Sequence, residues 1–339
     1  MKKIALITGI NGQDGAYLSK FLLKKKYKVI GIDRNTDKNN WRFKELKIHK
    51  NIIFKKIDIN NYKQLKNLFS KYKINEVYNL AAQSFVQNSF EDPLKTANAT
   101  GLSVLKILEI IRKSKKRIKF YQASSSEMFG DVNSKSQSET SSFNPQSPYA
   151  ISKLFGHYIT RHYRKSYNIY AVSGILFNHE SPLRGKEFVT KKIINGLIDI
   201  KNNKRKFIEL GNIYSKRDWG FAKEYVEQMW KMLKQKKPGD FVIATGKTYS
   251  IKDFVNEVTK NLKMKVKWKG NGLNEKLFLK NKNKAIIKIN RKLFRPSEVN
   301  YVRGDITKAK KILKWKPKIT FKKLIKIMVT EELKFLKKN

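Results

Sequence analysis

The sequence contains no cysteine among its 339 residues, which excludes disulfide bonds and thiolate metal sites. No metal site of any kind is expected. Long apolar runs are missing as well. The run Ile4–Ile7 meets Thr8-Gly9 far short of the roughly 18 to 20 residues of a membrane span, and too early for the apolar core of a signal peptide. We therefore expect a cytoplasmic protein with no membrane partner.

Acidic residues are scarce: 27 Asp and Glu stand against 75 Lys and Arg, a formal net charge of +48. Such a balance is compatible with a nucleic-acid partner. However, lysines occur in every segment, so we interpret most of the charge as solvated surface and expect no nucleic acid to bind. A basic nucleic-acid-binding protein stays the non-enzyme alternative. A third explanation of the charge is that it attracts anionic ligands in general. The 20 Phe, 15 Tyr and 5 Trp can fill a packed core, so the chain should be globular.

The first half of the chain alternates short apolar runs with helical periodicity. The runs are KKIALITG, YKVIGID, NIIFKKI, EVYNLAA, KFYQASS and YAVSGILF, and a helix is expected over about 15–25. Strands separated by helices predict an α/β fold with a doubly wound parallel sheet, a Rossmann domain. Functional residues in such a sheet gather beyond the carboxyl ends of the strands.

After about residue 178 the alternation becomes irregular, which predicts a smaller mixed α/β domain on the substrate side. We place the dinucleotide-binding domain at 1–177, with a later contribution from about 211–246 that includes the strand-like FVIATG, and the second domain mainly at 178–339. The basic stretch KNKNK at 280–284 is interpreted as a surface loop rather than an interaction tail.

Three glycines, Gly9, Gly12 and Gly15, lie directly after the first strand and before the first helix. Glycine permits a tight turn and a close backbone approach, and the positive end of the helix faces a pyrophosphate. In this context the spacing G-x-x-G-x-x-G predicts a dinucleotide site. Alone, it could equally be an ordinary turn.

The second strand ends in Asp33-Arg34, and these residues favour different cofactors. An acidic side chain binds the ribose 2′-hydroxyl of NAD, whereas an arginine accommodates the 2′-phosphate of NADP. Asp58, after the third strand, should lie near the adenine, or else it caps the following helix.

Tyr149 and Lys153 are four residues apart on an expected helix, so their side chains share one face. A phenol needs a depression of roughly three pKa units to act as a base at neutral pH, and a nearby ammonium and a positive nicotinamide can supply it. Ser125 provides a hydroxyl at a strand end, and Glu127 a carboxylate two residues later.

These motifs resemble the extended short-chain dehydrogenase/reductases. Longer stretches, in order, resemble the GDP-mannose 4,6-dehydratase family over nearly the whole chain: TGINGQDGAYL, VYNLAAQS, YQASSSEMFG, SPYAISK, GILFNHESP, RGKEFVTKKI, LGN, KRDWG, DFVIATG and FRPSEV. The resemblance implies oxidation of a GDP-hexose at C4, loss of water across C5 and C6, and return of the same hydride to C6. The product would be GDP-4-keto-6-deoxymannose, which leads to deoxysugars and GDP-fucose.

The resemblance implies that Ser125, Tyr149 and Lys153 serve the oxidation and that Glu127 serves the elimination as base and acid. The alternative for Glu127 is a residue that only caps the next turn. The implied cofactor residues are Gly9, Gly12, Gln13, Asp14, Gly15, Asp33, Arg34, Asp58, Ile59, Leu80, Ala81, Ser84, Tyr149 and Lys153. The implied substrate residues are Ser84, Ser126, Glu127, Asn178, Glu180, Arg184, Val189, Lys192, Gly211, Arg217, Arg295 and Glu298, so 178–339 would mainly bind the GDP-sugar.

The chain departs from the family pattern at several positions. Asn35 replaces an arginine, so NADP is expected but NAD stays possible, and DKNNWRFKEL replaces a serine-rich loop linked to tetramers, so a homodimer or a homotetramer is expected. Phe85 and Leu183 replace a common His and Arg, which leaves GDP-mannose or a related GDP-sugar such as a heptose as substrate. An NAD-dependent sugar-nucleotide epimerase or reductase is the other enzyme alternative.

Overall fold

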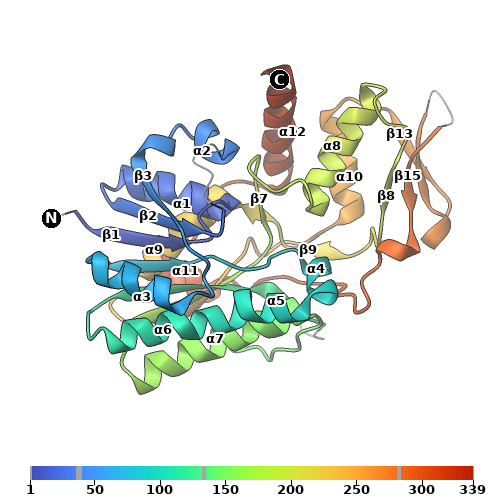
Figure 1. Cartoon of the computed structure of the whole chain (residues 1–339). Helices are drawn as coiled ribbons and strands as arrows, with labels where there is room; N and C mark the ends of the chain where they lie inside the picture. Colours follow the sequence, from blue (N-terminus) through green and yellow to red (C-terminus); the bar gives the residue numbers. More distant parts are fainter. Residues whose placement is uncertain (1, 36–39, 132–134, 281–283, 339) are drawn as a thin grey trace.

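The computed structural model describes residues 2–35, 40–131, 135–280 and 284–338. Its largest feature is a parallel sheet with helices on both faces (Figure 1). In the described residues this sheet has seven strands, in the order β11-β6-β5-β4-β1-β2-β3. They are β1 (Ile4–Thr8), β2 (Lys28–Asp33), β3 (Ile52–Lys56), β4 (Glu76–Asn79), β5 (Lys119–Ser125), β6 (Ala171–Leu176) and β11 (Asp240–Ile243). The predicted doubly wound parallel sheet is confirmed, because every neighbouring pair of its strands is parallel.

Successive side chains of a strand point to opposite faces of the sheet, and in β1 they enter two different cores. Ala5 and Ile7 belong to one cluster of buried residues, and Leu6 belongs to another. The first cluster includes residues of α1 (Gln13–Lys24), α9 (Ala222–Met232) and α11 (Thr307–Leu313). The second includes residues of α3 (Tyr62–Lys71), α6 (Ser103–Lys113) and α7 (Pro148–Ser166). The near-continuous apolar runs of the sequence are therefore strands covered on both faces.

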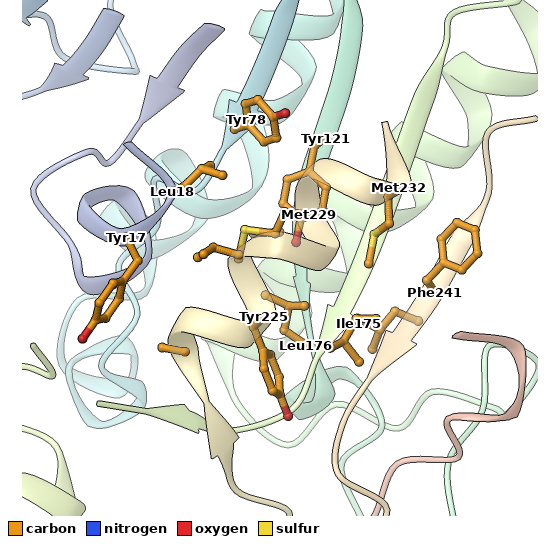
Figure 2. Close-up of a cluster of buried hydrophobic side chains, with 14 of the residues drawn as sticks. Tyr17, Leu18, Tyr78, Tyr121, Ile175, Leu176, Tyr225, Met229, Met232 and Phe241 are labelled. Atoms are coloured by element: carbon orange, nitrogen blue, oxygen red, sulfur yellow. The ribbon is translucent and has the colours of Figure 1, made fainter. Parts of the chain in front are cut away.

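Figure 2 shows the first cluster. Leu18 of α1 and Met229 of α9 lie against the sheet near Tyr78 and Tyr121, which are fully buried. Burial of such large side chains dominates the energy of a core. The helix expected over 15–25 begins two residues earlier, at Gln13, so both Gln13 and Asp14 lie in its first turn.

The sheet reverses its direction of growth next to β1. The chain passes from β1 to β2 and β3 on one side and then returns to β4, β5 and β6 on the other. At such a switch point the loops after the strands diverge and leave a crevice beyond their carboxyl ends. The turn after β1 and the loop after β4 border this crevice.

A second sheet, at the right of Figure 1, is formed by the second half of the chain. Its order is β13-β14-β15-β8, and only β8 and β15 pair in parallel. The strands are β8 (Ile208–Leu210), β13 (Val266–Lys269), β14 (Lys276–Leu279) and β15 (Lys284–Ile289). Residues of α8 (Val189–Lys201), α10 (Ile251–Asn261) and α12 (Phe321–Lys338) share a third buried cluster with it. The stretch KNKNK falls largely on 281–283, outside the described residues.

The remaining elements are short. They are α2 (Trp41–Glu45), α4 (Val86–Glu91), α5 (Pro93–Ala97), the π-helix η2 (Asn98–Leu102), the short strands β7 (His179–Glu180), β9 (Lys216–Arg217), β10 (Gly220–Phe221) and β12 (Tyr249–Ser250), and the 3-10 turns η1 (His49–Asn51), η3 (Ser126–Met128), η4 (Gly272–Asn274) and η5 (Arg291–Leu293). β7 pairs with β10, and β9 pairs with β12. None of the described helices combines the length and apolar character that crossing a bilayer requires.

Candidate active site

The glycine turn after β1 is shaped by close backbone contacts. Gly9 has a φ of +64°, and a Cβ there would lie 2.8 Å from the Cα of Ala81, beyond β4. A Cβ at Gly15 would lie 2.4 Å from the carbonyl oxygen of Ile10. The amide of Gly12 donates to the carbonyl of Gly9 at 3.1 Å, and α1 starts directly after it. The turn therefore presents backbone amides and a helix N-terminus at the crevice, which suits the pyrophosphate of a dinucleotide.

A cavity of about 550 Å³ fills the crevice and continues toward the second sheet. Segments far apart in the sequence line it: the glycine turn, the ends of β5 and β6, the start of α7, and loops of the second half of the chain. The predicted site residues that line it are Gly9, Gly12, Gln13, Asp14, Gly15, Leu80, Ser84, Ser125, Ser126, Glu127, Tyr149, Lys153, Asn178, Glu180, Arg184, Val189, Lys192, Gly211, Arg217, Arg295 and Glu298. Their individual roles stay predictions.

The catalytic candidates converge at the end of β5. Ser147 caps α7 by accepting a hydrogen bond from the amide of Ala150 at 3.1 Å, and Pro148 occupies the first helical position. This start places Tyr149 and Lys153 on the face that meets β5, where Lys153 Nζ donates to the carbonyl of Ala123 at 2.7 Å. Nζ lies 5.7 Å from the centroid of the Tyr149 ring.

Burial dominates the electrostatics of this pair. It raises the pKa of Tyr149 to about 12, although hydrogen bonding to Ser125 and the charge of Arg184 lower it. It lowers the pKa of Lys153 to about 8. The depression of the phenol pKa that was expected from Lys153 and a nicotinamide together is therefore not seen in the chain by itself, because burial raises this pKa more than Ser125 and Arg184 lower it. The low pKa of Lys153 instead makes its proton easier to release than that of an exposed lysine.

Glu127 lies in the short turn η3, which begins directly after Ser125. The hydroxyl of Ser125 accepts a hydrogen bond from the amide of Glu127 at 3.2 Å, so the serine, not the glutamate, caps this turn. The carboxylate of Glu127 faces the cavity instead, with Oε2 3.4 Å from Nη1 of Arg295. The alternative that Glu127 serves only as a cap is therefore wrong. A carboxylate and a phenol in one cavity provide two groups for proton transfer.

Basic side chains mark the end of the cavity toward the second sheet. Arg217 is buried, which lowers its pKa, while the charge of Glu127 raises it. Its Nη2 lies 3.8 Å from Oε1 of Glu298, which also accepts a hydrogen bond from Ser215 at 3.3 Å. Two guanidinium groups, those of Arg217 and Arg295, thus border one cavity, and such forked donors suit a diphosphate.

Five predicted cofactor residues do not line this cavity in the described structure: Asp33, Arg34, Asp58, Ile59 and Ala81. Asp33 ends β2, and burial raises its pKa. The carboxylate of Asp58 accepts from the amide of Asn60 at 2.8 Å, but the residue that caps α3 is Asn61. The alternative of Asp58 as the helix cap is therefore wrong, and its place near the adenine stays a prediction.

Sequence reasoning missed several residues of the site. His179 forms a partly buried contact with Asp14, Arg42 donates to the carbonyl of Leu183, and Phe188 lines the cavity beside Phe85, with ring centroids 5.9 Å apart. His179 lies inside NHESP, one of the family-specific stretches, so that motif was the available signal. Leu183, in contrast, is buried and does not line the cavity among the described residues.

The fold and the site together define an enzyme of the extended short-chain dehydrogenase/reductase class. Solved structures of this class superimpose on the chain at low sequence identity. UDP-glucose 4-epimerase from Thermotoga maritima matches with a TM-score of 0.82 at 20% identity, covering 98% of this chain and 99% of that chain. dTDP-glucose 4,6-dehydratase from Bacillus anthracis, in complex with NAD, matches with a TM-score of 0.80 at 20% identity, covering 98% and 97%. The fold is thus shared by epimerases and dehydratases and does not separate them.

Sequence similarity identifies the family. The model of the family described as GDP-mannose 4,6 dehydratase matches residues 6–328. A GDP-mannose 4,6 dehydratase of Drosophila melanogaster is 44% identical over 346 residues, covering 99% of this chain and 88% of the relative. The chain belongs to the GDP-mannose 4,6-dehydratase family.

Proposed function

We propose that this protein converts GDP-mannose to GDP-4-keto-6-deoxymannose and water, with the nicotinamide cofactor bound throughout. The observation that carries the proposal is that Ser125, Glu127, Tyr149 and Lys153 line one cavity together with the glycine turn and Arg217. A carboxylate that faces this cavity is what elimination requires and simple oxidation does not. A cytoplasmic location, with a product that feeds deoxysugar synthesis, is part of the same proposal.

The residues present fit a dinucleotide. Side chains at Gly9 or Gly15 would collide with backbone, the turn precedes a helix, and Lys153 lies beyond it in the same cavity. NAD(P) held there would supply the redox chemistry, since its nicotinamide would take up the hydride of C4 and give it back at C6. Tyr149 takes the proton of the C4 hydroxyl, Ser125 orients that hydroxyl by a hydrogen bond, and Lys153 stabilises the phenolate that this role requires.

Glu127 serves the elimination. Once C4 is a ketone, the C5 proton is acidified, and the carboxylate removes it as base. The same carboxyl group then protonates the departing C6 hydroxyl, so one side chain carries a proton from C5 to the leaving water. The enone that remains gains the returned hydride at C6 and needs a proton at C5, and the proton that Tyr149 took from the C4 hydroxyl closes this count.

We propose that residues 178–339 mainly bind the GDP portion, with Arg217, Arg295 and Lys192 facing the diphosphate. Burial lowers the pKa of Lys192, so it is the weakest of the three cations at high pH. We also propose NADP as the cofactor, with Arg34 facing the 2′-phosphate. Asp33 favours NAD instead, so the ratio of the two dissociation constants tests this choice.

A related GDP-sugar such as a heptose is the second candidate substrate. Two substitutions suggested it, but Leu183 is buried away from the cavity and only Phe85 lines it. The support for a larger sugar therefore rests on the wall formed by Phe85 and Phe188.

Mass spectrometry of GDP-mannose, after incubation with the purified protein and a catalytic amount of NADP, tests the proposal. We expect the loss of one water per sugar nucleotide. The assay is repeated with NAD and with the GDP-heptose. Loss of water from the GDP-heptose alone would show that the heptose, and not GDP-mannose, is the substrate. No reaction with either sugar nucleotide would contradict the proposed function.

We propose further that the protein is a homo-oligomer, a dimer or a tetramer. Ile151, Phe155 and Tyr158 form an exposed apolar stripe along α7, and Leu94 and Leu102 are exposed on the neighbouring α5 and η2. Contiguous apolar surface of this kind is typical of an interface. A second copy is the occupant that we propose, since a stripe on one helix can face itself across a twofold axis.

A further inference from the structure

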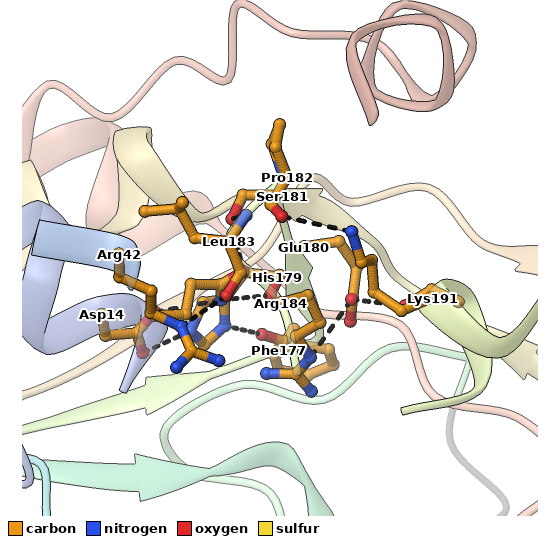
Figure 3. Close-up of polar contacts among 12 residues, drawn as sticks. Asp14, Arg42, Phe177, His179, Glu180, Ser181, Pro182, Leu183, Arg184 and Lys191 are labelled. Atoms are coloured by element: carbon orange, nitrogen blue, oxygen red, sulfur yellow. Dashed lines mark hydrogen bonds and ion pairs between the residues drawn. The ribbon is translucent and has the colours of Figure 1, made fainter. Parts of the chain in front are cut away.

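The loop of residues 177–184, here called the linking loop, connects β6 with the segment before α8 and lies between the cofactor turn and the substrate side (Figure 3). Its backbone and side chains contact α1, α2 and α8 through hydrogen bonds and ion pairs.

His179 makes the first contact with the cofactor side. Its Nε2 lies 2.7 Å from Oδ2 of Asp14, in the first turn of α1, and its Nδ1 lies 2.7 Å from the carbonyl oxygen of Phe177. Both neighbours are hydrogen-bond acceptors, and an imidazole satisfies two acceptors only when both nitrogens carry protons. The geometry therefore describes a cationic His179 paired with an anionic Asp14 (Figure 3).

The charged groups around this pair agree with that state. Burial lowers the pKa of His179 and Arg184 lowers it further, but Asp14 and the carbonyl of Phe177 raise it above its ordinary value overall. Tyr225 of α9 stacks on the imidazole at 4.8 Å, and burial keeps this phenol neutral by raising its pKa. Burial raises the pKa of Asp14, but His179 and Arg184 lower it below its ordinary value overall.

Two further side chains tie the loop to the glycine turn. Gln13 donates from Nε2 to the carbonyl of His179 at 3.0 Å and accepts from the hydroxyl of Ser181 at 2.6 Å. Arg42 of α2 donates from Nε to the carbonyl of Leu183 at 2.8 Å and from Nη1 to the carbonyl of Asn11 at 3.2 Å. The guanidinium of Arg42 thus bonds the linking loop and the glycine turn at once.

The other side of the linking loop contacts the substrate side. Glu180 accepts a hydrogen bond from Thr190 at 2.6 Å, and its Oε2 lies 3.2 Å from Nε of Arg184. Lys191 of α8 donates to the carbonyl of Pro182 at 3.3 Å and pairs with Glu332 of α12. Glu180 and Arg184 of the loop and Thr190 of α8 line the cavity, so the linking loop forms part of its wall.

We propose that the linking loop couples the two ligands, so that binding of the dinucleotide and of the GDP moiety strengthen each other, with His179 and Arg42 as the positioning residues. A dinucleotide bound at the glycine turn fixes the positions of Gln13 and Asp14. These two residues bond to the linking loop and fix it in turn. The loop then presents Glu180 and Arg184 to the substrate. By linkage, the effect must be the same in both directions. This inference rests on the proposed function, whose chemistry requires the cofactor to stay bound while the sugar is oxidised and reduced.

Isothermal titration calorimetry tests the coupling without turnover. The Kd of NADP is measured alone and with saturating GDP, and the Kd of GDP is measured alone and with saturating NADP. For the natural protein we expect each ligand to tighten the other by the same factor, about 5-fold or more. His179→Asn and Arg42→Met should each bring this factor close to one. His162→Asn, a change at an exposed histidine of α7, should leave it unchanged.

The pH dependence of the factor separates this role from a purely structural one. The pKa of His179 is raised, so the ion pair is complete below that pKa and is lost as the pH rises through it. The factor of the natural protein should therefore fall as the pH rises through the pKa of His179, while that of His179→Asn stays flat.

Each outcome is decisive. If GDP binds but the factor is one in the natural protein, or if both variants keep the natural factor, the coupling is wrong. If the natural protein binds no GDP, the proposed function itself fails. Should His179→Asn not fold, as judged by circular dichroism, Arg42→Met and the pH series of the natural protein provide the same test.

Discussion

At the scale of single residues, the site combines groups whose surroundings shift their chemistry in different directions. Tyr149 and Lys153 are both buried, and burial raises the pKa of the first to about 12 and lowers that of the second to about 8. Glu127 keeps its carboxylate beside Arg295, a residue 168 positions away in the sequence. The proposed division of roles between oxidation and elimination thus depends on four side chains within one cavity, those of Ser125, Glu127, Tyr149 and Lys153.

Replacing Glu127 by Gln should stop dehydration and leave cofactor binding intact. The amide keeps the shape of the side chain but cannot remove the C5 proton, and loss of a general base typically lowers a rate by about 10² to 10⁴. The measurement is the loss of water from GDP-mannose by mass spectrometry, beside the Kd of NADP. A variant that turned over at the natural rate would show that another group is the base.

The ionisation of Lys153 should be visible in the stability of the protein. Because its folded pKa of about 8 lies below the ordinary 10.5, the unfolded chain binds more protons between these values, and this residue's contribution to stability rises with pH there. The difference in unfolding free energy between the natural protein and Lys153→Met should therefore increase by about 1 kcal/mol per pH unit from pH 8 to 10. Urea unfolding at pH 7, 8, 9 and 10 measures it, and a constant difference would contradict the lowered pKa.

At the scale of elements, the site is built from the ends of parallel strands. The turn after β1 is packed against the segment after β4, and η3 follows β5 without a break. Functional side chains are well positioned at a strand end, because the sheet holds the backbone while the side chains beyond it are free to face a ligand. This explains why short motifs in a long sequence converge on one crevice.

Replacing Gly9 by Ala should destabilise the protein and weaken NADP binding. The new Cβ would lie 2.8 Å from the Cα of Ala81 in a backbone conformation with φ +64°, so overpacking adds to conformational strain. Gly272→Ala is the matched control, since its φ is +57° and no atom lies within 4 Å. We expect the control to cost about 1 kcal/mol and Gly9→Ala about 2 to 4 kcal/mol in unfolding free energy. Equal losses in urea unfolding would show that the close approach to Ala81 does not matter.

At the scale of the whole molecule, the two sheets form one enzyme because the cavity runs between them. The glycine turn belongs to the first sheet, and Arg217 and Arg295 come from the second half of the chain. The net charge of +48 is spread over the surface, so two copies of the protein repel each other. An apolar contact between them is needed to overcome this repulsion. The exposed stripe on α7 supplies such a surface.

Replacing Ile151 by Glu should shift the protein toward monomers. Ile151 is 56% exposed at the proposed interface, and a charge there would lose its hydration on association. Leu273→Glu is the control, as Leu273 is similarly exposed on η4, in the second half of the chain. Sedimentation velocity measures both variants. A natural protein that sediments as a monomer would contradict the proposed oligomer, and an Ile151→Glu protein that stays associated would contradict this interface.

The local order of the sequence determined the parallel sheet and the position of the catalytic candidates. Apolar runs separated by helical periodicity leave few alternatives for the topology, and residues at strand ends or four apart on a helix have known relative places. For this reason Ser125, Glu127, Tyr149 and Lys153 could be predicted to meet.

Only the tertiary structure decided which distant residues complete the site. Leu183 and His179 belong to the same short loop, yet one is buried away from the cavity and the other pairs with Asp14, 165 residues earlier. Burial raises the pKa of Tyr149, whereas Lys153 was expected to lower it. Burial, too, is a property of the packed molecule. Such contacts depend on how the linking loop and the second sheet pack against the first, and no local periodicity encodes that arrangement.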